Sequence, residues 1–373
     1  MRYKSGLQRD PFEYLSDLRC RSADGIVQLP SGGWCVTDAD LAHALLRDAE
    51  FNGGRSGFFG ELLPTRAAQV AVGHAVRTIL RTHELEYRGA LVEAVAALPT
   101  ATRWPAAATG LVYRCLKNVL LHPRTQPRTR QLVDQAVHGG IVFRAENVWQ
   151  RTRAEILRAK LIASINEEVR RRRESAVGEP LDVLDAVVGA CPSELADRTV
   201  TGVFLVLFRS IVAPVSASLA WSVLLACLHT TSDSPWPWPA DWIVREAMRH
   251  RPMVWMVGRA IPQTKEFGGV SFQSGDILSV SPYLLHHDEH HWTDVDVFRP
   301  ERWAETGERG PYIPFGAGPF TCPGASVAHM LVTEAVTALT TGAHLTARGG
   351  DMRPMMVEGA VPRPFTILRT INE

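Results

Sequence analysis

One long apolar segment, residues 203–228, limits what this chain can fold into. It is apolar enough to resemble a membrane span, but Arg209, Pro214, Ser216 and Ser218 interrupt it. A segment of this kind fits a helix that protein surrounds on all sides better than one that lipid surrounds. The segment therefore predicts a buried helix through the middle of one large domain, which we expect to span residues 1–373.

The composition of the chain can bury such a helix, because 46% of its 373 residues are apolar and 21% are charged. This balance supports a sizeable core and excludes a disordered chain. The 40 basic and 39 acidic side chains nearly cancel, so the overall basic character typical of nucleic-acid binding is missing. We therefore expect no nucleic-acid partner.

The cysteines and the N-terminal residues indicate the compartment. Six cysteines without a C-x-x-C pair are too few for a disulfide framework in a chain of this length, so most are expected to be buried thiols in a reducing environment. The first residues lack the apolar stretch of a secretory signal or membrane anchor. These features predict a cytoplasmic protein with no membrane partner.

Apolar periodicity predicts a mainly α fold with minor β. Residues 25–37 alternate around a Gly-Gly turn, which is typical of a β-hairpin, and Asp38 or Asp40 can cap a following helix. The pattern of residues 67–228 is mostly helical, and in 153–173 the apolar side chains mark one helix face. The arginine run 170–173 at the end of that stretch is expected to face solvent.

The C-terminal part alternates between short strands and helices. A helix is expected from Asp241, and short strands are expected within 254–261, 270–272 and 277–280. Glycine and proline residues separate these strands. The outcome is a helical body with small β-sheets.

A glycine-rich loop directly before an apolar-periodic helix carries one cysteine, Cys322. A thiolate at a helix N-terminus is stabilised by the helix dipole and by unpaired backbone N–H groups. Gly316 and Gly318 permit a tight backbone path. Gly324 removes a side chain where a flat group can lie, and Phe315 supplies an aromatic shield. These features suit a thiolate that ligates a haem iron and is kept dry.

This loop resembles the haem-binding loop of the cytochrome P-450 superfamily. The family pattern F-x-x-G-x-x-x-C-x-G is matched by Phe315, Gly318, Cys322 and Gly324. The resemblance implies the cytochrome P-450 fold, in which a long central helix lies over a haem beside small β-sheets. It also implies haem b, protohaem IX iron, with the thiolate of Cys322 as its metal ligand.

A second resemblance to the family lies upstream of the loop. Glu246 and Arg249 match its E-x-x-R pattern, and residues three apart share one helix face and can pair. The segment 298–303 looks like the family's following loop, in which Arg302 is the best match to an arginine that joins the pair. These three residues are expected to be structural rather than catalytic.

The resemblance also indicates which residues bind the haem propionates. Arg259 occupies the family's position for a propionate-pairing arginine, and Arg77, with His74 one turn earlier, is a candidate for the second propionate. The family usually has a basic residue two positions before the cysteine, where this chain has Phe320. One propionate contact is therefore lost or comes from another residue.

The predicted central helix departs from the family pattern. The family carries a glycine kink and an acid–alcohol pair that relays protons, whereas residues 209–221 contain no Asp, Glu or Thr. One alignment puts Pro214 at the kink and Ser216 at the pair, and another puts Pro214 itself at the pair. Proline should kink the helix and free a carbonyl near residue 210. Ser216 or Ser218 could then orient a water, with Pro214 as the kink device.

The alternative is a changed reaction. Hydrogen peroxide could supply both oxygen atoms, as in the peroxygenase branch of the family, or the substrate could deliver the protons. A reaction without oxygen insertion, such as oxidative coupling, dehydration or chemistry on an N–O substrate, is the third variant. Ala213 stands where the peroxygenase branch has a carboxylate-binding arginine, which counts against a fatty-acid substrate.

The resemblance implies a haem-thiolate oxidoreductase, similar to a cytochrome P-450 monooxygenase, that oxidises a small organic molecule of specialised metabolism. An apolar or aromatic substrate is expected. Since no reductase domain is fused to the chain, a ferredoxin and its reductase would supply electrons unless peroxide drives the reaction. We expect a monomer. The alternative from another class is a non-catalytic haem-binding carrier or sensor.

Overall fold

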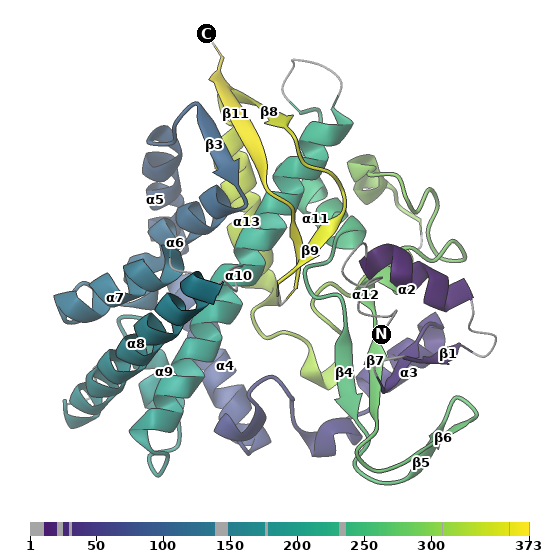
Figure 1. The fold of residues 1–373 in the computed structure, drawn as a ribbon, viewed down its shortest axis with the longest axis horizontal. Helices are drawn as coiled ribbons and strands as arrows, with labels where there is room; N and C mark the ends of the chain where they lie inside the picture. The colour runs from purple at the N-terminus through teal and green to yellow at the C-terminus, as the bar shows by residue number, and fades with distance from the viewer. Residues whose placement is uncertain are drawn as a thin grey trace.

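Helix α10 (Asp197–His229) runs through the middle of the fold, as the sequence predicts (Figure 1). The computed structural model describes residues 11–20, 25–29, 32–138, 148–175, 178–230, 236–307, 309–357 and 359–372. Within that part of the chain, α10 is the one helix long and apolar enough to cross a membrane, yet 83% of its most apolar window is buried inside the protein. The helix is therefore the axis of the core.

The other helices surround this axis. In Figure 1, α5 to α9 lie on one side of α10, and α11 and α13 run beside it. Their bounds are α2 (Pro11–Cys20), α3 (Ala39–Arg47), α4 (Arg66–Thr82), α5 (Glu84–Ala96), α6 (Ala106–Leu120), α7 (Pro127–His138), α8 (Val148–Glu174), α9 (Val183–Ala190), α11 (Ala240–His250), α12 (Pro282–His286) and α13 (Ala325–Thr340). Short 3₁₀ turns are η1 (Phe51–Gly54), η2 (Gly60–Leu62), η3 (Pro300–Ala304) and η4 (Gly318–Phe320).

Small sheets flank the helices on the opposite side and at one end. One has the strand order β1 (Ile26–Gln28), β2 (Trp34–Val36), β7 (Ile277–Val280) and β4 (Val257–Ala260), in which only β2 and β7 are parallel. A second joins β3 (Ala101–Trp104), β11 (Phe365–Ile371) and β8 (Ala343–Arg348). Two antiparallel pairs complete the described strands: β5 (Lys265–Phe267) with β6 (Val270–Phe272), and β9 (Pro354–Met356) with β10 (Ala360–Pro362).

Side-chain caps fix where several helices begin. Asp38 accepts a hydrogen bond from the Leu41 backbone N–H at 2.8 Å, so of the two acids proposed from the sequence it is Asp38 that caps α3. Thr65 caps α4 in the same way. Because α4 begins there, its first residue, Arg66, stands at the end of the helix that meets the cysteine loop.

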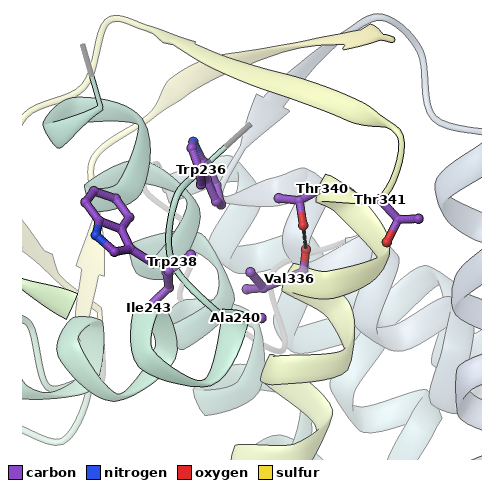
Figure 2. Close-up of a pocket in the computed structure, with 7 residues that line it drawn as sticks. All are labelled: Trp236, Trp238, Ala240, Ile243, Val336, Thr340 and Thr341. Carbon is purple, nitrogen blue, oxygen red and sulfur yellow. Dashed lines mark hydrogen bonds between the residues drawn. The ribbon is translucent and has the colours of Figure 1, made fainter. Parts of the chain in front are cut away.

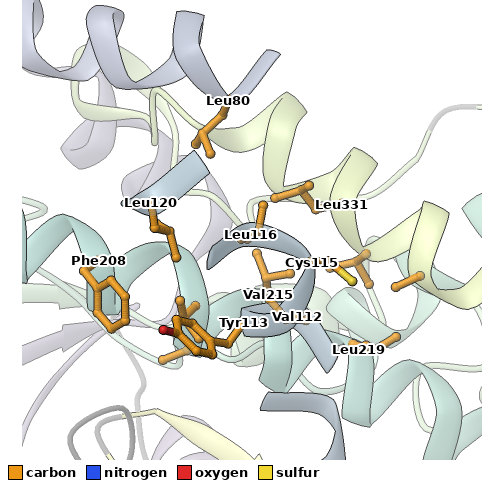
Figure 3. Close-up of a cluster of buried hydrophobic side chains, with 14 of the residues drawn as sticks. Leu80, Val112, Tyr113, Cys115, Leu116, Leu120, Phe208, Val215, Leu219 and Leu331 are labelled. Carbon is orange, nitrogen blue, oxygen red and sulfur yellow. The ribbon is translucent and has the colours of Figure 1, made fainter. Parts of the chain in front are cut away.

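The main core lies where α4, α6, α10 and α13 meet. Figure 3 shows apolar side chains of these helices converging, with Val215 and Leu219 of α10 among Leu116 of α6 and Leu331 of α13. All four are buried. Burying a leucine contributes about 1.5–3 kcal/mol, so this cluster fixes α10 against the helix that follows the cysteine loop.

The structure confirms most of the predicted helices and strands, and it corrects the predicted solvent exposure of one arginine run. The hairpin, the helix from Asp241 and the strands after Pro252 are present. The arginine run 170–173 was expected to face solvent, but Arg172 binds the fully buried Asp182, at 2.6 Å, and Arg173 binds Asp197. The expectation was wrong for these two residues because Asp182 and Asp197, from later parts of the chain, lie against the end of α8, where Arg172 also pairs with Glu168 of its own helix.

The helix face proposed within 153–173 is only partly correct. Leu161 and Ile165 are buried, as predicted, but Ile156 is 55% exposed. Helical periodicity identifies which side chains share a face, but not how far along the helix that face is covered.

Candidate functional site

The cysteine loop is held in one conformation by its own backbone and by α3. The Cys322 N–H donates to the carbonyl of Phe315 at 3.0 Å, which closes the loop. Gly316 and Gly318 have φ values of +74° and +72°, a region that favours glycine. A Cβ on Gly318 would also overlap the backbone of Leu46 in α3. The loop therefore depends on glycine at 318 for both its turn and its close approach to α3.

Cys322 differs from the other cysteines whose side chains the structure describes. Cys35, Cys115 and Cys191 are buried and Cys227 is half-buried, whereas Cys322 is exposed. Desolvation by the surrounding chain raises the pKa of the thiol, and a hydrogen bond from the Gly324 backbone opposes this. Coordination to a metal deprotonates a thiol outright, so a bound metal would stabilise the thiolate here.

The single thiolate of Cys322 fits a metal whose other ligands are supplied by a cofactor rather than by side chains. Among the residues that the structure describes, no group of three or more His, Cys, Asp or Glu side chains could hold a metal ion. A single thiolate suffices as a ligand where a macrocycle supplies the equatorial donors, as in haem. Phe315, in the loop itself, is half-buried against the main core.

Arg259 provides a second test of whether the residues present fit a haem. It is 5% exposed, and among the described residues its Nη1 donates only to the backbone carbonyl of Gly258 and its Nε has no hydrogen-bond partner. Burial lowers the pKa of this guanidinium. No carboxylate of the described residues pairs with it. A buried cation without a counter-charge is costly, so an anionic group such as a haem propionate fits here.

The other two propionate candidates lie on α4. Arg77 is half-buried, His74 is exposed, and Arg77 Nη2 lies 2.9 Å from His74 Nδ1. Helix α4 reaches the cysteine loop one turn earlier, where a Cβ on Gly73 would lie 3.2 Å from Pro323. The structure thus brings α4 to the loop, but it pairs Arg77 with His74.

Two guanidinium groups meet the ring of Phe320, the residue that replaces the family's usual cation. Arg66 lies over this ring, with its Cζ 4.8 Å from the ring centre, and the Cζ of Arg259 lies at 5.2 Å. Arg66 also donates to the carbonyl of Pro319. Sequence reasoning missed Arg66, because no motif marks it and its contacts join residues about 250 positions apart.

The structure brings together the three residues predicted to form an ion cluster. Glu246 Oε1 lies 2.9 Å from Arg249 Nη2 and 3.0 Å from Arg302 Nε, and all three side chains are buried. Arg249 Nη1 also donates to the carbonyls of His286 and Val295. The cluster thereby ties α11 to the segment between α12 and η3.

Helix α10 continues through Pro214 without a break. Along its first part, half-buried residues recur every four positions, at Val206, Ser210 and Pro214, and the stripe ends at Ser218, which is 9% exposed. Ser216 lies off this stripe, is fully buried and donates to the carbonyl of Val212 at 2.6 Å. Its hydroxyl is therefore engaged within the helix.

Ser218 is different, because its hydroxyl makes no hydrogen bond with any residue that the structure describes. Its backbone carbonyl accepts from Ser222 Oγ at 2.7 Å. Of the two serines proposed from the sequence, Ser218 is the one whose hydroxyl is free to bind a water or a substrate.

A separate pocket of about 210 Å³ lies elsewhere (Figure 2). Its lining comes from α11, the segment before α11 and the C-terminal end of α13: Trp236, Trp238, Ala240, Ile243, Val336, Thr340 and Thr341. The cysteine loop precedes the other end of α13, roughly 22 Å away at 1.5 Å per residue. This pocket is therefore not part of the cysteine site.

The comparisons with known proteins agree with this geometry. Residues 240–341, which contain the ion cluster and the cysteine loop, match the family model Cytochrome P450. Cyclooctatin synthase of Streptomyces melanosporofaciens is 28% identical over 234 residues, which cover 55% of this chain and 50% of that protein. The chain spans between about a fifth and a half of the length of the first curated relatives it matches.

Solved structures extend the likeness to the whole fold. A zebra fish cytochrome P450 with progesterone has a TM-score of 0.76 at 20% identity, covering 96% of this chain and 99% of that one. A structure titled for unusual cytochrome P450-like monooxygenases of microbial secondary metabolism has a TM-score of 0.68 at 18% identity, covering 93% and 96%. At these identities the likeness shows the fold alone. The chain therefore has the cytochrome P450 fold, and its segment 240–341 is similar to the Cytochrome P450 family.

Proposed function

We propose that this protein is a haem-thiolate oxidoreductase in which Cys322 ligates the iron of haem b. The observation that carries the proposal is the pairing of an exposed cysteine, in a loop closed by its own backbone, with the buried and uncompensated Arg259. The first supplies a soft metal ligand and the second a partner for an anion. A haem has both groups, an iron centre and propionates.

In this proposal, the cysteine loop would hold the iron ligand in position and leave room beside it for the haem. The loop keeps the Cys322 sulfur in place through the Phe315 carbonyl and the close contact of Gly318 with α3. Gly324 leaves the space beside the sulfur open, since a Cβ there would meet only Cys322 Sγ, at 3.9 Å. When bound, a thiolate-ligated haem supplies the activation of dioxygen or peroxide for oxidation of an organic substrate.

The proposed substrate is a small apolar or aromatic molecule of specialised metabolism. Support comes from the names of relatives such as cyclooctatin synthase and from the neighbour whose title refers to microbial secondary metabolism. Electrons would come from a separate ferredoxin and its reductase. A monomeric protein in the cytoplasm completes the proposal.

Reconstitution with haem tests the ligand. The purified protein, loaded with protohaem and reduced under carbon monoxide, should show the red-shifted Soret band of a thiolate–CO complex. Cys322→Ser should lose that band, while Cys227→Ser, a matched change at a half-buried cysteine, should keep it. A thiolate band retained by Cys322→Ser, or a wild-type protein that takes up no haem, would refute the assignment.

A peroxide-driven reaction is the second candidate, and the sequence of helix α10 favours it. Residues 209–221 lack any acid, and Ser216 is engaged by Val212. Turnover with hydrogen peroxide should therefore exceed turnover with reduced ferredoxin, compared on a substrate found by its spin-shift on binding. Tightly coupled ferredoxin-driven hydroxylation would contradict this candidate. Coupling, dehydration or N–O chemistry would appear as products without an inserted oxygen, and a carrier or sensor would give no product.

A further inference from the structure

Phe320 brings two cations to one place beside the proposed iron ligand. The Cζ atoms of Arg66 and Arg259 lie 4.8 and 5.2 Å from the centre of its ring, so the two guanidinium groups are no more than about 10 Å apart. They come from different parts of the fold, the first residue of α4 and strand β4. Two like charges this close repel each other unless an anion lies between or beside them.

The protein supplies no such anion among its described residues. Neither arginine forms an ion pair with a described carboxylate, and their hydrogen bonds go to the backbone carbonyls of Pro319 and Gly258. The aromatic ring attracts both cations through its face, which holds them in position but does not neutralise them. The pair of arginines therefore has its geometry fixed and its charge uncompensated.

The position of the pair indicates which anion it takes. Phe320 is two residues before Cys322, and Arg66 contacts Pro319 of the same short turn, η4. The same loop thus fixes the sulfur and both guanidinium groups. A ligand that carries a metal centre and carboxylates on one planar ring system matches this arrangement.

We propose that Arg66 and Arg259 together bind the haem propionates, and that Phe320 is the positioning residue that holds both guanidinium groups on its ring. Arg66 thereby supplies the contact that the substitution of the family's basic residue by Phe320 removes. This inference rests on the proposed function, since it requires the haem. It assigns to Arg66 the role that the sequence suggested for Arg77, whose guanidinium is bound to His74.

The rate at which holoprotein loses haem to an excess of a haem-scavenging apoprotein tests Arg66. Arg66→Gln should raise this rate about tenfold, because it removes a charge-assisted hydrogen bond to a carboxylate. Arg77→Gln, a matched change on the same helix, should change the rate less than twofold. Equal rates for the two variants, or a larger effect of Arg77→Gln, would overturn the assignment. Thermal unfolding of the haem-free proteins checks that both variants remain folded.

Two substitutions test the role of Phe320: one removes its aromatic ring, and the other replaces the ring with a basic side chain. Phe320→Leu keeps an apolar side chain but removes the ring face, and should speed haem loss severalfold while the thiolate–CO band persists. Phe320→His restores a basic group two residues before the cysteine, and should rescue most of the defect when combined with Arg66→Gln. A double variant that loses haem as fast as Arg66→Gln alone would contradict the idea that one contact replaces the other.

These outcomes separate this inference from the proposed function. If wild-type protein takes up no haem, or binds it without a thiolate band, the proposed function fails and the haem-loss assay cannot begin. If wild-type protein shows the thiolate band but Arg66→Gln loses haem at the wild-type rate, only the propionate assignment fails. Each result therefore bears on one claim.

Discussion

The indole N–H of Trp303 donates to Glu246 Oε2 at a distance of 3.0 Å, inside the buried ion cluster. The same carboxylate accepts hydrogen bonds from Arg249, Arg302 and the backbone N–H of Arg299. One negative charge therefore serves two buried arginines, with Trp303 completing the set of donors. Trp303 ends the segment 298–303 that resembles the family's loop, but sequence reasoning gave it no role of its own.

Removing the charge of Glu246 should unfold the region or prevent haem uptake. Glu246→Gln keeps the shape but leaves two buried arginines without a counter-charge, which costs about 3–5 kcal/mol of unfolding free energy. Trp303→Phe keeps the charge and loses one hydrogen bond, which costs about 1–3 kcal/mol. Urea unfolding of both variants measures the difference. A Glu246→Gln protein as stable as wild type and fully loaded with haem would show that the cluster is not structural.

A second buried ion pair, between Arg172 and Asp182, should also contribute strongly to stability. Asp182 is fully buried, accepts two hydrogen bonds from Arg172 and caps α9. Arg172→Leu should therefore lower the unfolding free energy by about 3–5 kcal/mol. Arg170→Leu, two residues earlier and exposed, should change it by less than about 0.5 kcal/mol. Equal effects in urea unfolding would mean that the Arg172 pair contributes no more than a surface charge.

The contrast between Arg170 and Arg172 shows where sequence reasoning stops. The sequence correctly indicated a helix and a charged end, because both are local properties. It could not indicate that Arg172 turns toward Asp182, because the partner is set by the packing of α8 against α9. The same holds for strand β3, which pairs with β11 more than 250 residues later.

The candidate site likewise divides into residues that the sequence could indicate and residues that only the packing of the chain brings together. Cys322 and the glycines around it could be predicted because they form one short motif, and Glu246, Arg249 and Arg302 because they resemble a family pattern. Arg66 and the free hydroxyl of Ser218 depend on which side chains meet in space. The exchange of a basic residue for Phe320 was visible in the sequence, but the two arginines on its ring were not.

Stability should fall in acid because His286 is held neutral. Its Nδ1 lies 3.1 Å from the Arg249 carbonyl, and its Nε2 accepts from the Ile313 N–H at 2.9 Å, so a second proton has no place. Burial, assisted by Arg249, lowers the pKa of His286 to about 3. The unfolded chain binds this proton near pH 6.5 and the folded chain does not, so the folded state loses stability as the pH falls from about 6.5 toward 3.

The pH dependence is measured by urea unfolding of wild type and His286→Gln. Between about pH 6 and pH 4 the wild type should lose about 1.4 kcal/mol per pH unit more than the variant, which corresponds to one proton. Two other buried histidines, His250 and His287, also have lowered pKa values and affect both proteins equally. Parallel curves for the two proteins would show that His286 does not titrate as described.

The last prediction concerns Ser218, whose hydroxyl ends the half-buried stripe of α10. If this hydroxyl orients water or substrate in place of the missing acid–alcohol pair, Ser218→Ala should lower product formed per electron consumed, by about tenfold where proton delivery limits the reaction. Ser222→Ala, one turn along the same helix, removes a hydroxyl that is buried and bound to the Ser218 carbonyl. It should change unfolding free energy by about 1 kcal/mol and leave the coupling ratio as it is.

The comparison also distinguishes the two oxidants. With hydrogen peroxide, which already carries its protons, Ser218→Ala should retain more of the wild-type rate than it does with reduced ferredoxin. A matching loss with both oxidants would assign Ser218 to substrate binding instead, and the dissociation constant from the substrate-induced spin shift would then rise in parallel. An unchanged ratio with ferredoxin would remove Ser218 from the reaction, leaving the proton supply to the substrate or to water, because no acid lies in residues 209–221.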